Sequence, residues 1–270
     1  MRDSGDLWKA RARAVKKARK ATRRGEPEGL HDLRVSLRRT SATARALGAK
    51  SVARAAKKLA VSLADERQMQ VDRQLLARIG KLGYLSPDAT TALAARWEKL
   101  AERGGRRIAR AVNGRVVRFI IRDLRKLSRR RRDEMVERLD RARRKAEITL
   151  DEPLEGKDDE SLHRYRMSVK KARYLGEDLA ALGVRQFSPQ IEREKALQEA
   201  LGRWNDLRLF RRRLAESRDE AEERGSVTLV AELERLLGAL QPTIEDVRRT
   251  AIEISRSSAK IVPLRRQAVR

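Results

Sequence analysis

The chain has 270 residues, of which 66 are Lys or Arg and 39 are Asp or Glu, so its formal net charge is +27 at pH 7. The absence of cysteine excludes disulfides, thiolate metal sites and a cysteine nucleophile, and no apolar run is long enough to span a membrane. Hydrophobic residues make up 40% of the chain and can build a core, whereas aromatic residues make up only 3%, a usage typical of long helices.

Helical periodicity runs through almost the whole sequence, and no stretch alternates apolar and polar residues as a half-buried strand would. We therefore expect an all-α fold. Helices are predicted over residues 7–23, 30–47, 50–82, 88–110, 114–127, 131–149, 160–182, 189–222 and 227–256. Helix ends are predicted at Gly25, Gly83, Gly183 and Gly225.

Two Ser-Pro pairs, at residues 86–87 and 188–189, predict helix starts in which the serine is the N-cap and the proline is the first helical residue. The acidic segment 150–161, which contains Pro and Gly, is the one clear change of composition. We interpret it as a linker between a first half, residues 1–149, and a second half, residues 162–270.

The two halves resemble each other in sequence. An offset of 132 residues aligns the segment that begins at Leu30 with the segment that begins at Leu162. The aligned pairs are His31 with His163, Arg34 with Arg166, Arg38 with Lys170 and Arg39 with Lys171; six extra residues in the second half then align Lys57 with Lys195 and Arg67 with Asn205. We interpret this pattern as an internal duplication of one helical unit, which contains both histidines of the chain.

Helices 30–47 and 162–182 each separate a basic stripe from an apolar stripe. At about 100° per residue, the first basic stripe contains His31, Arg34, Arg38 and Arg45, while the leucines at 30, 33 and 37 face another side. The second basic stripe contains His163, Arg166, Lys170, Arg173 and Tyr174. Each helix is therefore predicted to pack with one face and to present clustered positive charge on a neighbouring face.

The basic stripes are electrostatically unfavourable unless an anion binds. Like charges on neighbouring turns destabilise a helix by roughly 0.2–0.5 kcal/mol per pair, and no acid interrupts the first stripe. Each histidine lies near a helix N-terminus, where unpaired N–H groups favour an anion, and an anionic neighbour would raise the histidine pKa. The pattern indicates a site for a phosphate-bearing anion; the alternative is a pair of histidines that only satisfy backbone groups.

Three segments resemble the signature helices of the CHAD domain, the conserved histidine α-helical domain: LHDLRVSLRRT from residue 30, LHRYRMSVKKARYLGEDL from residue 162 and LQEALGRWNDLRLF from residue 197. The resemblance covers about residues 7–257. It implies two four-helix bundles related by a pseudo-twofold axis, with a central basic groove or pore between them. It also implies that the groove binds inorganic polyphosphate without catalysis and that the protein associates with polyphosphate granules.

The stripes and the resemblance together give the candidate polyphosphate-binding residues: His31, Arg34, Arg38, Arg39, Arg45, Lys57, Arg67, His163, Arg166, Lys170, Lys171, Arg173, Tyr174 and Lys195. The first copy departs from the family pattern, because Gln68 follows Arg67 where the family tends to have Asp. Gln68 cannot orient a neighbouring arginine as a carboxylate would. Neither a metal nor a cofactor is expected.

Nucleic acid is the main alternative partner, because a large positive charge and the basic runs at 129–132 and 211–213 suit any polyanion. Few aromatic residues are available for base stacking, however, and no helix-turn-helix or zinc-finger pattern is present. Basic runs of this kind are more often solvated helix faces. A phosphohydrolase is the third class, and a structural scaffold, with polyphosphate binding incidental, is a further alternative.

Catalysis is not expected, because the sequence contains no P-loop, histidine-rich metal cluster or nucleophile elbow. The segment EAEER at 220–224 superficially resembles a Glu-x-Glu-x-Lys metal motif, but its two glutamates would point to different sides of a helix. Charges run through the N-terminal residues without an apolar signal core, so a cytoplasmic location is expected.

Overall fold

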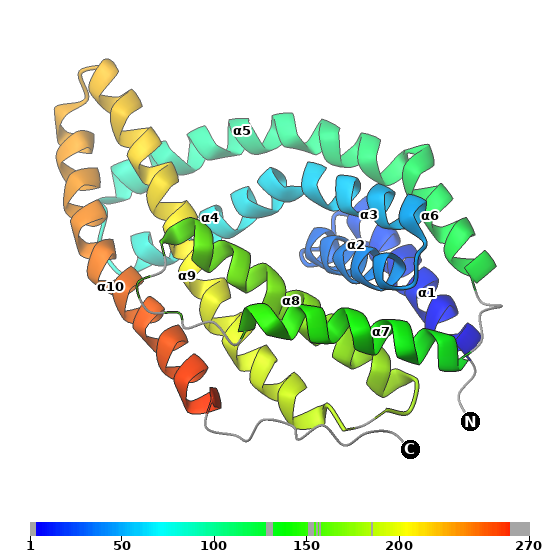
Figure 1. Ribbon diagram of the computed structural model, residues 1–270. Coiled ribbons are helices and arrows are strands. Elements are labelled where there is room, and N and C mark those ends of the chain that lie inside the picture. Colours follow the sequence, from blue (N-terminus) through cyan, green and yellow to red (C-terminus); the bar gives the residue numbers. More distant parts are fainter. Residues whose placement is uncertain are drawn as a thin grey trace.

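The computed structural model describes residues 4–127, 132–150, 154, 156, 158–184 and 186–259, and the regular structure in these ranges is entirely helical (Figure 1). The elements are α1 (Ser4–Arg23), α2 (Gly29–Ala46), α3 (Lys50–Ser62), α4 (Ala64–Lys81), α5 (Pro87–Asn113), α6 (Arg115–Lys126), α7 (Arg132–Glu147), the 3₁₀ helix η2 (Ile148–Leu150), α8 (Asp159–Ala181), α9 (Ser188–Glu223) and α10 (Val227–Ala259). The all-α fold predicted from the periodicity is confirmed.

The single helix predicted over 50–82 is wrong, because α3 and α4 are separate helices that meet at Leu63. This fully buried residue leaves the helical conformation with φ −104° and ψ 11°. Leu59 of α3 packs into one hydrophobic cluster, whereas Leu76 of α4 packs into another. The chain therefore turns between two cores at a point that neither glycine nor proline marks in the sequence.

The two Ser-Pro pairs behave differently. Ser86 is the N-cap of α5, and its hydroxyl accepts a hydrogen bond from the backbone N–H of Ala89 at 3.2 Å. Ser188, in contrast, is already the first residue of α9, and the buried Phe187 occupies the N-cap position. The predicted N-cap at Ser188 is therefore wrong, because α9 begins one residue earlier than expected.

All four glycines predicted at helix ends adopt positive φ angles, between 70° and 90°. A side chain rarely adopts this left-handed conformation, so glycine is the residue that allows the chain to leave a helix there. The prediction of these helix ends is confirmed.

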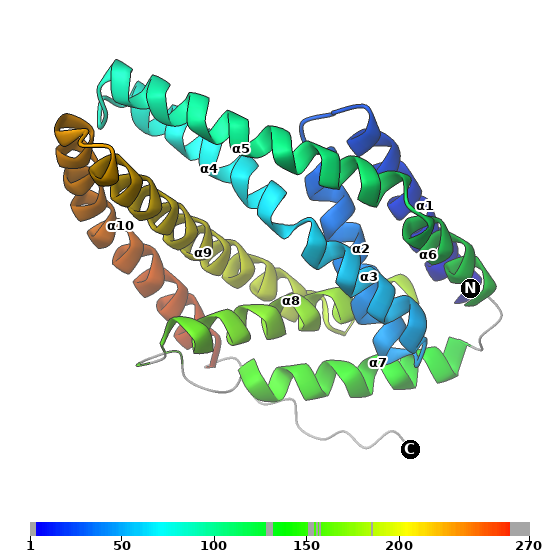
Figure 2. The same ribbon diagram turned by 90° about the horizontal axis from the view of Figure 1, so that it is seen from above.

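Two long helical hairpins, α4–α5 and α9–α10, lie side by side on one side of the molecule (Figure 2). They share one hydrophobic cluster, in which the rings of Trp97 in α5 and Phe210 in α9 pack edge to face at a centroid distance of 6.0 Å. Trp97 also donates a hydrogen bond to the hydroxyl of Ser217 at 3.2 Å. The two hairpins therefore form one packed unit, although the predicted linker separates them in sequence.

A second cluster joins α1, α2, α3 and α6 to the C-terminal part of α8 through Leu175 and Leu179. A third cluster joins the N-terminal part of α8 to α9 and α10, and it includes Leu154 from the predicted linker. Two of the three clusters thus contain residues from both predicted halves. Helix α8 runs between the second and third clusters, which places its polar face inside the molecule.

Buried charges hold α8 in this position. Asp178 accepts hydrogen bonds from Arg11 of α1 and from Thr43 of α2. The fully buried guanidinium of Arg143 in α7 donates to the carbonyl oxygen of Ala172 in α8 at 2.5 Å and to the carboxylate of Glu194 in α9 at 2.8 Å. Buried ion pairs of this kind fix relative positions strongly, because removing one partner leaves an uncompensated charge.

Gly176 of α8 lies directly against Arg143, since a Cβ atom at this position would come within 2.5 Å of a guanidinium nitrogen.

Across the part of the chain that the structure describes, none of the helices is long and apolar enough to cross a membrane.

Candidate functional site

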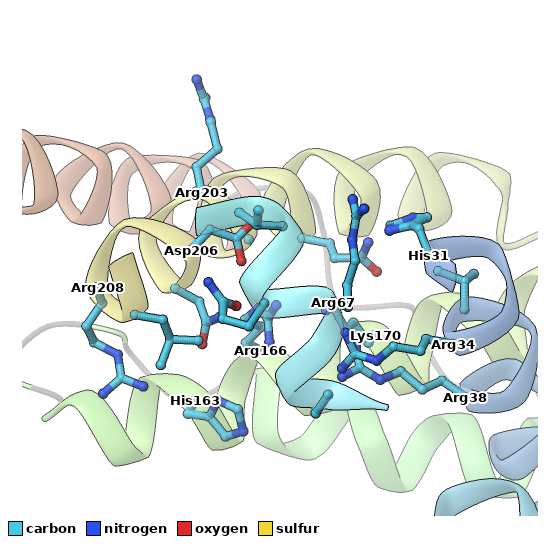
Figure 3. Close-up of a pocket in the computed structure, with 18 of the residues that line it drawn as sticks. His31, Arg34, Arg38, Arg67, His163, Arg166, Lys170, Arg203, Asp206 and Arg208 are labelled. Atoms are coloured by element: carbon cyan, nitrogen blue, oxygen red, sulfur yellow. The ribbon is translucent and has the colours of Figure 1, made fainter. Parts of the chain in front are cut away.

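A pocket of about 1130 Å³ lies between α2, α4, α8 and α9 (Figure 3). Ten of the candidate residues predicted from the sequence line it: His31, Arg34, Arg38, Arg39, Arg67, His163, Arg166, Lys170, Arg173 and Tyr174. We call this cavity the basic pocket. The two aligned helices, α2 and α8, thus direct their basic stripes into the same space.

Four candidate residues do not line the basic pocket: Arg45, Lys57, Lys171 and Lys195. Arg45 shares the angular position of His31, but fourteen residues of helix place it about 21 Å farther along α2. Lys57 and Lys195 are exposed on other faces. Lys171 follows the pocket residue Lys170 by one position, so it points about 100° away from it.

Helix α9 contributes arginines that the candidate set lacks: Arg203, Arg208, Arg212 and Arg213. Two of them belong to the run at 211–213, which we interpreted as a solvated face. Helical spacing could have identified Arg208, Arg212 and Arg213, because positions 205, 208, 209, 212, 213 and 216 lie on one face of α9, the face that carries Asn205. Arg203 points away from the other labelled side chains (Figure 3).

The other basic run, Arg129 to Arg132, lies largely outside the described residues. Arg132, at the start of α7, is described, and its guanidinium donates to the carbonyl oxygen of Leu182 at 2.6 Å. This arginine supports the fold, because it holds α7 against the end of α8.

Three cations at the centre of the basic pocket lie close together and are shielded from water. Arg166 and Lys170 are each only 8% exposed, and Arg34 is half-buried. Burial, and then repulsion from neighbouring arginines, lowers the pKa of Arg34 to about 10. Burial also lowers the pKa of Arg166 to about 10, and burial followed by the charges of Arg166 and Arg38 lowers the pKa of Lys170 well below its usual range.

These central cations have little compensation inside the protein. Among the described residues, Arg34, Arg38, Arg166 and Lys170 form no ion pair, and the Nε of Arg166 is buried without a hydrogen-bond partner. Asp206 of α9 favours the charged forms of Arg34, Arg166 and Lys170, but it lies farther from them than an ion pair. Unpaired buried cations cost free energy unless an anion joins them, so this geometry favours an anionic ligand.

The two histidines lie at the edges of the basic pocket (Figure 3). Although each imidazole keeps an exposed edge, burial by the surrounding helices lowers the pKa of both rings. The charge of Arg67 adds to this effect at His31, and the charge of Arg166 adds to it at His163, where hydrogen bonding to Asn205 opposes it. Without a ligand, both rings therefore favour the neutral form.

Arg39 and Arg173 already have partners inside the protein. Their guanidinium groups lie over the ring of Tyr174 at 5.2 and 5.3 Å from its centroid. Both also pair with Glu177, at 3.0 Å from Arg39 and 3.5 Å from Arg173. This cluster orders one wall of the basic pocket and has less unsatisfied charge to offer a ligand than the central cations have.

Gln68 does not orient Arg67. Its amide donates to the buried carboxylate of Asp72 at 2.8 Å, and Arg213 of α9 donates to the same carboxylate at 2.7 Å. Arg67 donates instead to the side chain of Gln70 at 3.2 Å. The departure from the family pattern thus places Gln68 in a contact that joins α4 to α9 at one wall of the basic pocket.

The described residues contain no group of three or more His, Cys, Asp or Glu side chains that could hold a metal ion. The acids that line the basic pocket stand apart, among arginines. Its chemistry is therefore that of many hydrogen-bond donors that converge on one cavity from four helices, an arrangement suited to phosphate oxygens.

Comparisons with known proteins identify the family and similar folds. The model of the CHAD domain family matches residues 6–215. The crystal structure of the CHAD domain from the plant Ricinus communis is 20% identical in sequence and superposes with a TM-score of 0.67 over 93% of this chain and 92% of that chain. PptA from Streptomyces chartreusis is 17% identical, with a TM-score of 0.69 over 95% of this chain and 100% of that chain. No curated protein matches the sequence.

Proposed function

Because the chain belongs to the CHAD domain family, which is linked to polyphosphate, we propose that it binds inorganic polyphosphate in the basic pocket, noncovalently and without catalysis. The ligand is a flexible chain with about one negative charge per phosphate. The cations of α2 and α8 contact its oxygens from two sides, and the histidines contact it at the edges.

One observation carries this proposal: Arg34, Arg38, Arg166 and Lys170 converge in a cavity without forming an ion pair in the described parts of the chain. Like charges in such proximity repel one another and are poorly hydrated there. A chain of phosphates supplies several negative charges at once, so it can neutralise all four cations.

The lining of the basic pocket favours polyphosphate over nucleic acid. Tyr174 is the one Trp, Tyr or Phe among its described lining residues, and two guanidinium groups already lie over its ring. A single strand would find no free Trp, Tyr or Phe ring among these residues on which to stack its bases. Polyphosphate has no bases, so the lack of stacking rings does not reduce its affinity.

In this proposal the basic pocket is the central groove of the family, and the aligned helices α2 and α8 are equivalent parts of two duplicated bundles. Binding to long chains would then bring the protein to polyphosphate granules in the cytoplasm. General polyanion binding, nucleic acid included, is the alternative that the experiment must separate from this proposal.

The test is a competition titration at one near-physiological salt concentration. Long-chain polyphosphate, single-stranded DNA and double-stranded DNA, matched in phosphate count, displace the same labelled polyanion. We expect polyphosphate to compete at least about tenfold better than either DNA, a difference of about 1.4 kcal/mol. Equal competition by DNA would identify a general polyanion binder.

A pair of variants with equal charge tests the position of the site. Arg34→Ala with Arg166→Ala removes two central cations, whereas Arg13→Ala with Arg54→Ala removes two exposed cations that do not line the basic pocket. We expect the first double variant to lose at least about tenfold in affinity for polyphosphate and the second to lose less than about threefold. Equal losses would mean that binding depends on overall charge alone.

A further inference from the structure

Lys170 differs from the cations around it in its chemistry. It is the one amine among the described residues that line the basic pocket, where the permanent cations are guanidinium groups. An amine that loses its proton becomes a nucleophile, whereas a guanidinium keeps its proton. At the aligned position of the first half the chain has Arg38, so this chemistry exists on one side of the pocket only.

The surroundings of Lys170 favour the neutral amine. Its side chain is 8% exposed and forms neither an ion pair nor a hydrogen bond among the described residues. Arg34 and Arg38 extend toward it from α2, and Arg166 lies one turn before it on α8 (Figure 3). The carboxylate of Asp206, on α9, favours the ammonium form, but burial and the neighbouring arginines outweigh it, so the pKa of Lys170 is lowered.

We propose that Lys170 is a covalent-modification site, at which the amine forms an imine with aldehydes that carry a phosphate group. The three neighbouring guanidinium groups hold the phosphate, and the amine attacks the carbonyl carbon. This inference goes beyond polyphosphate binding and does not depend on it, because it requires only one phosphate in the basic pocket.

The reaction balances without an oxidant or a reductant. The nitrogen lone pair of Lys170 forms a bond to the aldehyde carbon, and the resulting carbinolamine loses the former carbonyl oxygen as water, together with the two hydrogens of the amine. The step needs a neutral amine at the start, which the arginines favour as long as the basic pocket holds no polyanion. A bound polyanion reverses this effect, because its charge favours the ammonium form.

Lys171 provides a control inside the same protein. It is half-buried, and burial lowers its pKa as well, with Lys145 and Arg45 as the nearby charges. It does not line the basic pocket. A reaction that depends only on a lowered pKa should therefore modify both lysines, whereas a reaction directed by phosphate should select Lys170.

The experiment uses pyridoxal 5′-phosphate and pyridoxal, which carry the same aldehyde with and without a phosphate group. Sodium borohydride reduces each imine to a stable amine, and peptide mass spectrometry gives the rate at each lysine. We expect pyridoxal 5′-phosphate to modify Lys170 at least about tenfold faster than pyridoxal does, and both reagents to modify Lys171 at similar rates. Equal rates of the two reagents at Lys170, or no modification of it, would overturn the proposal.

The variant Lys170→Arg keeps the positive charge and removes the amine, so the phosphate-dependent labelling should disappear while labelling of Lys171 stays unchanged. If phosphate-dependent labelling of the protein persists in this variant, another lysine carries it and the assignment is wrong. Added long-chain polyphosphate should slow labelling of Lys170 if both ligands use the basic pocket. Selective labelling that polyphosphate does not slow would contradict the proposed function and leave the modification site intact.

Discussion

The salt dependence of polyphosphate binding can be predicted from the pairing of the cations in the basic pocket. Among the described residues, eleven Lys and Arg side chains line this pocket, but six of them already form ion pairs with acids: Arg39, Arg67, Arg173, Arg208, Arg212 and Arg213. Of the others, Arg203 points away from the other labelled side chains (Figure 3). Four cations that form no ion pair with any described residue remain to replace counterions on the ligand: Arg34, Arg38, Arg166 and Lys170.

With about −0.7 per contact, the value for single strands, four contacts give a slope of about −2.8 for the logarithm of the association constant against the logarithm of salt concentration. A rise from 50 to 200 mM salt would then weaken binding by about fiftyfold. If all eleven cations exchanged their partners for phosphate, the slope would approach about −8.

Fluorescence anisotropy with end-labelled polyphosphate at five or six salt concentrations measures this slope. The double variant Arg34→Ala, Arg166→Ala should reduce it to about −1.4, whereas Arg13→Ala, Arg54→Ala should leave it unchanged. A slope that both double variants reduce equally would refute the counting of unpaired cations. A wild-type slope near −8 would show that the arginines in ion pairs also bind the ligand.

Three further predictions concern pH and stability. The pKa values of both histidines are lowered in the free protein, and a bound anion raises them, so binding of polyphosphate should take up protons. Affinity for polyphosphate should therefore increase as pH falls through the range near 6.5. Calorimetry in buffers of different ionisation enthalpy measures the proton uptake. Arg143→Ala, which leaves Glu194 buried without its partner, should lower the free energy of unfolding by about 3–5 kcal/mol in denaturant titrations, whereas the exposed Arg164→Ala should change it by less than about 1 kcal/mol. Ser86→Ala should lower the free energy of unfolding by about 1 kcal/mol through loss of a helix cap, whereas Ser188→Ala should lower it much less. Equal melting temperatures of the two variants in thermal denaturation would contradict this difference.

Local sequence patterns predict much of this fold because helices depend on short-range spacing. The glycines at helix ends and the N-cap at Ser86 are determined by residues within one turn, and the structure bears them out. The break at Leu63 is different, because it arises from packing into two separate cores. Such a turn depends on contacts with residues far away in the sequence, which periodicity does not contain.

The candidate site shows the same division. A helical stripe identifies residues that share a face, so Arg34 and Arg166 were found from spacing alone. Spacing does not give the length of the cavity. Arg45 therefore lies on the same face of α2 as Arg34 but does not line the basic pocket. Spacing places Arg208, Arg212 and Arg213 on one face of α9, but the sequence does not show that this face packs across α4, a contact that Arg213 and Asp72 secure.

The hydrophobic clusters that cross the predicted linker have a consequence for a cut chain. If a protease site were inserted between Leu150 and Asp158 and cleaved, the fragments would still share the cluster that contains Trp97 and Phe210. The cluster that contains Leu175 and Leu179 would likewise join them. The nicked protein should therefore stay assembled, and two separately expressed fragments, each with exposed apolar helix faces, should reconstitute the fold by complementation.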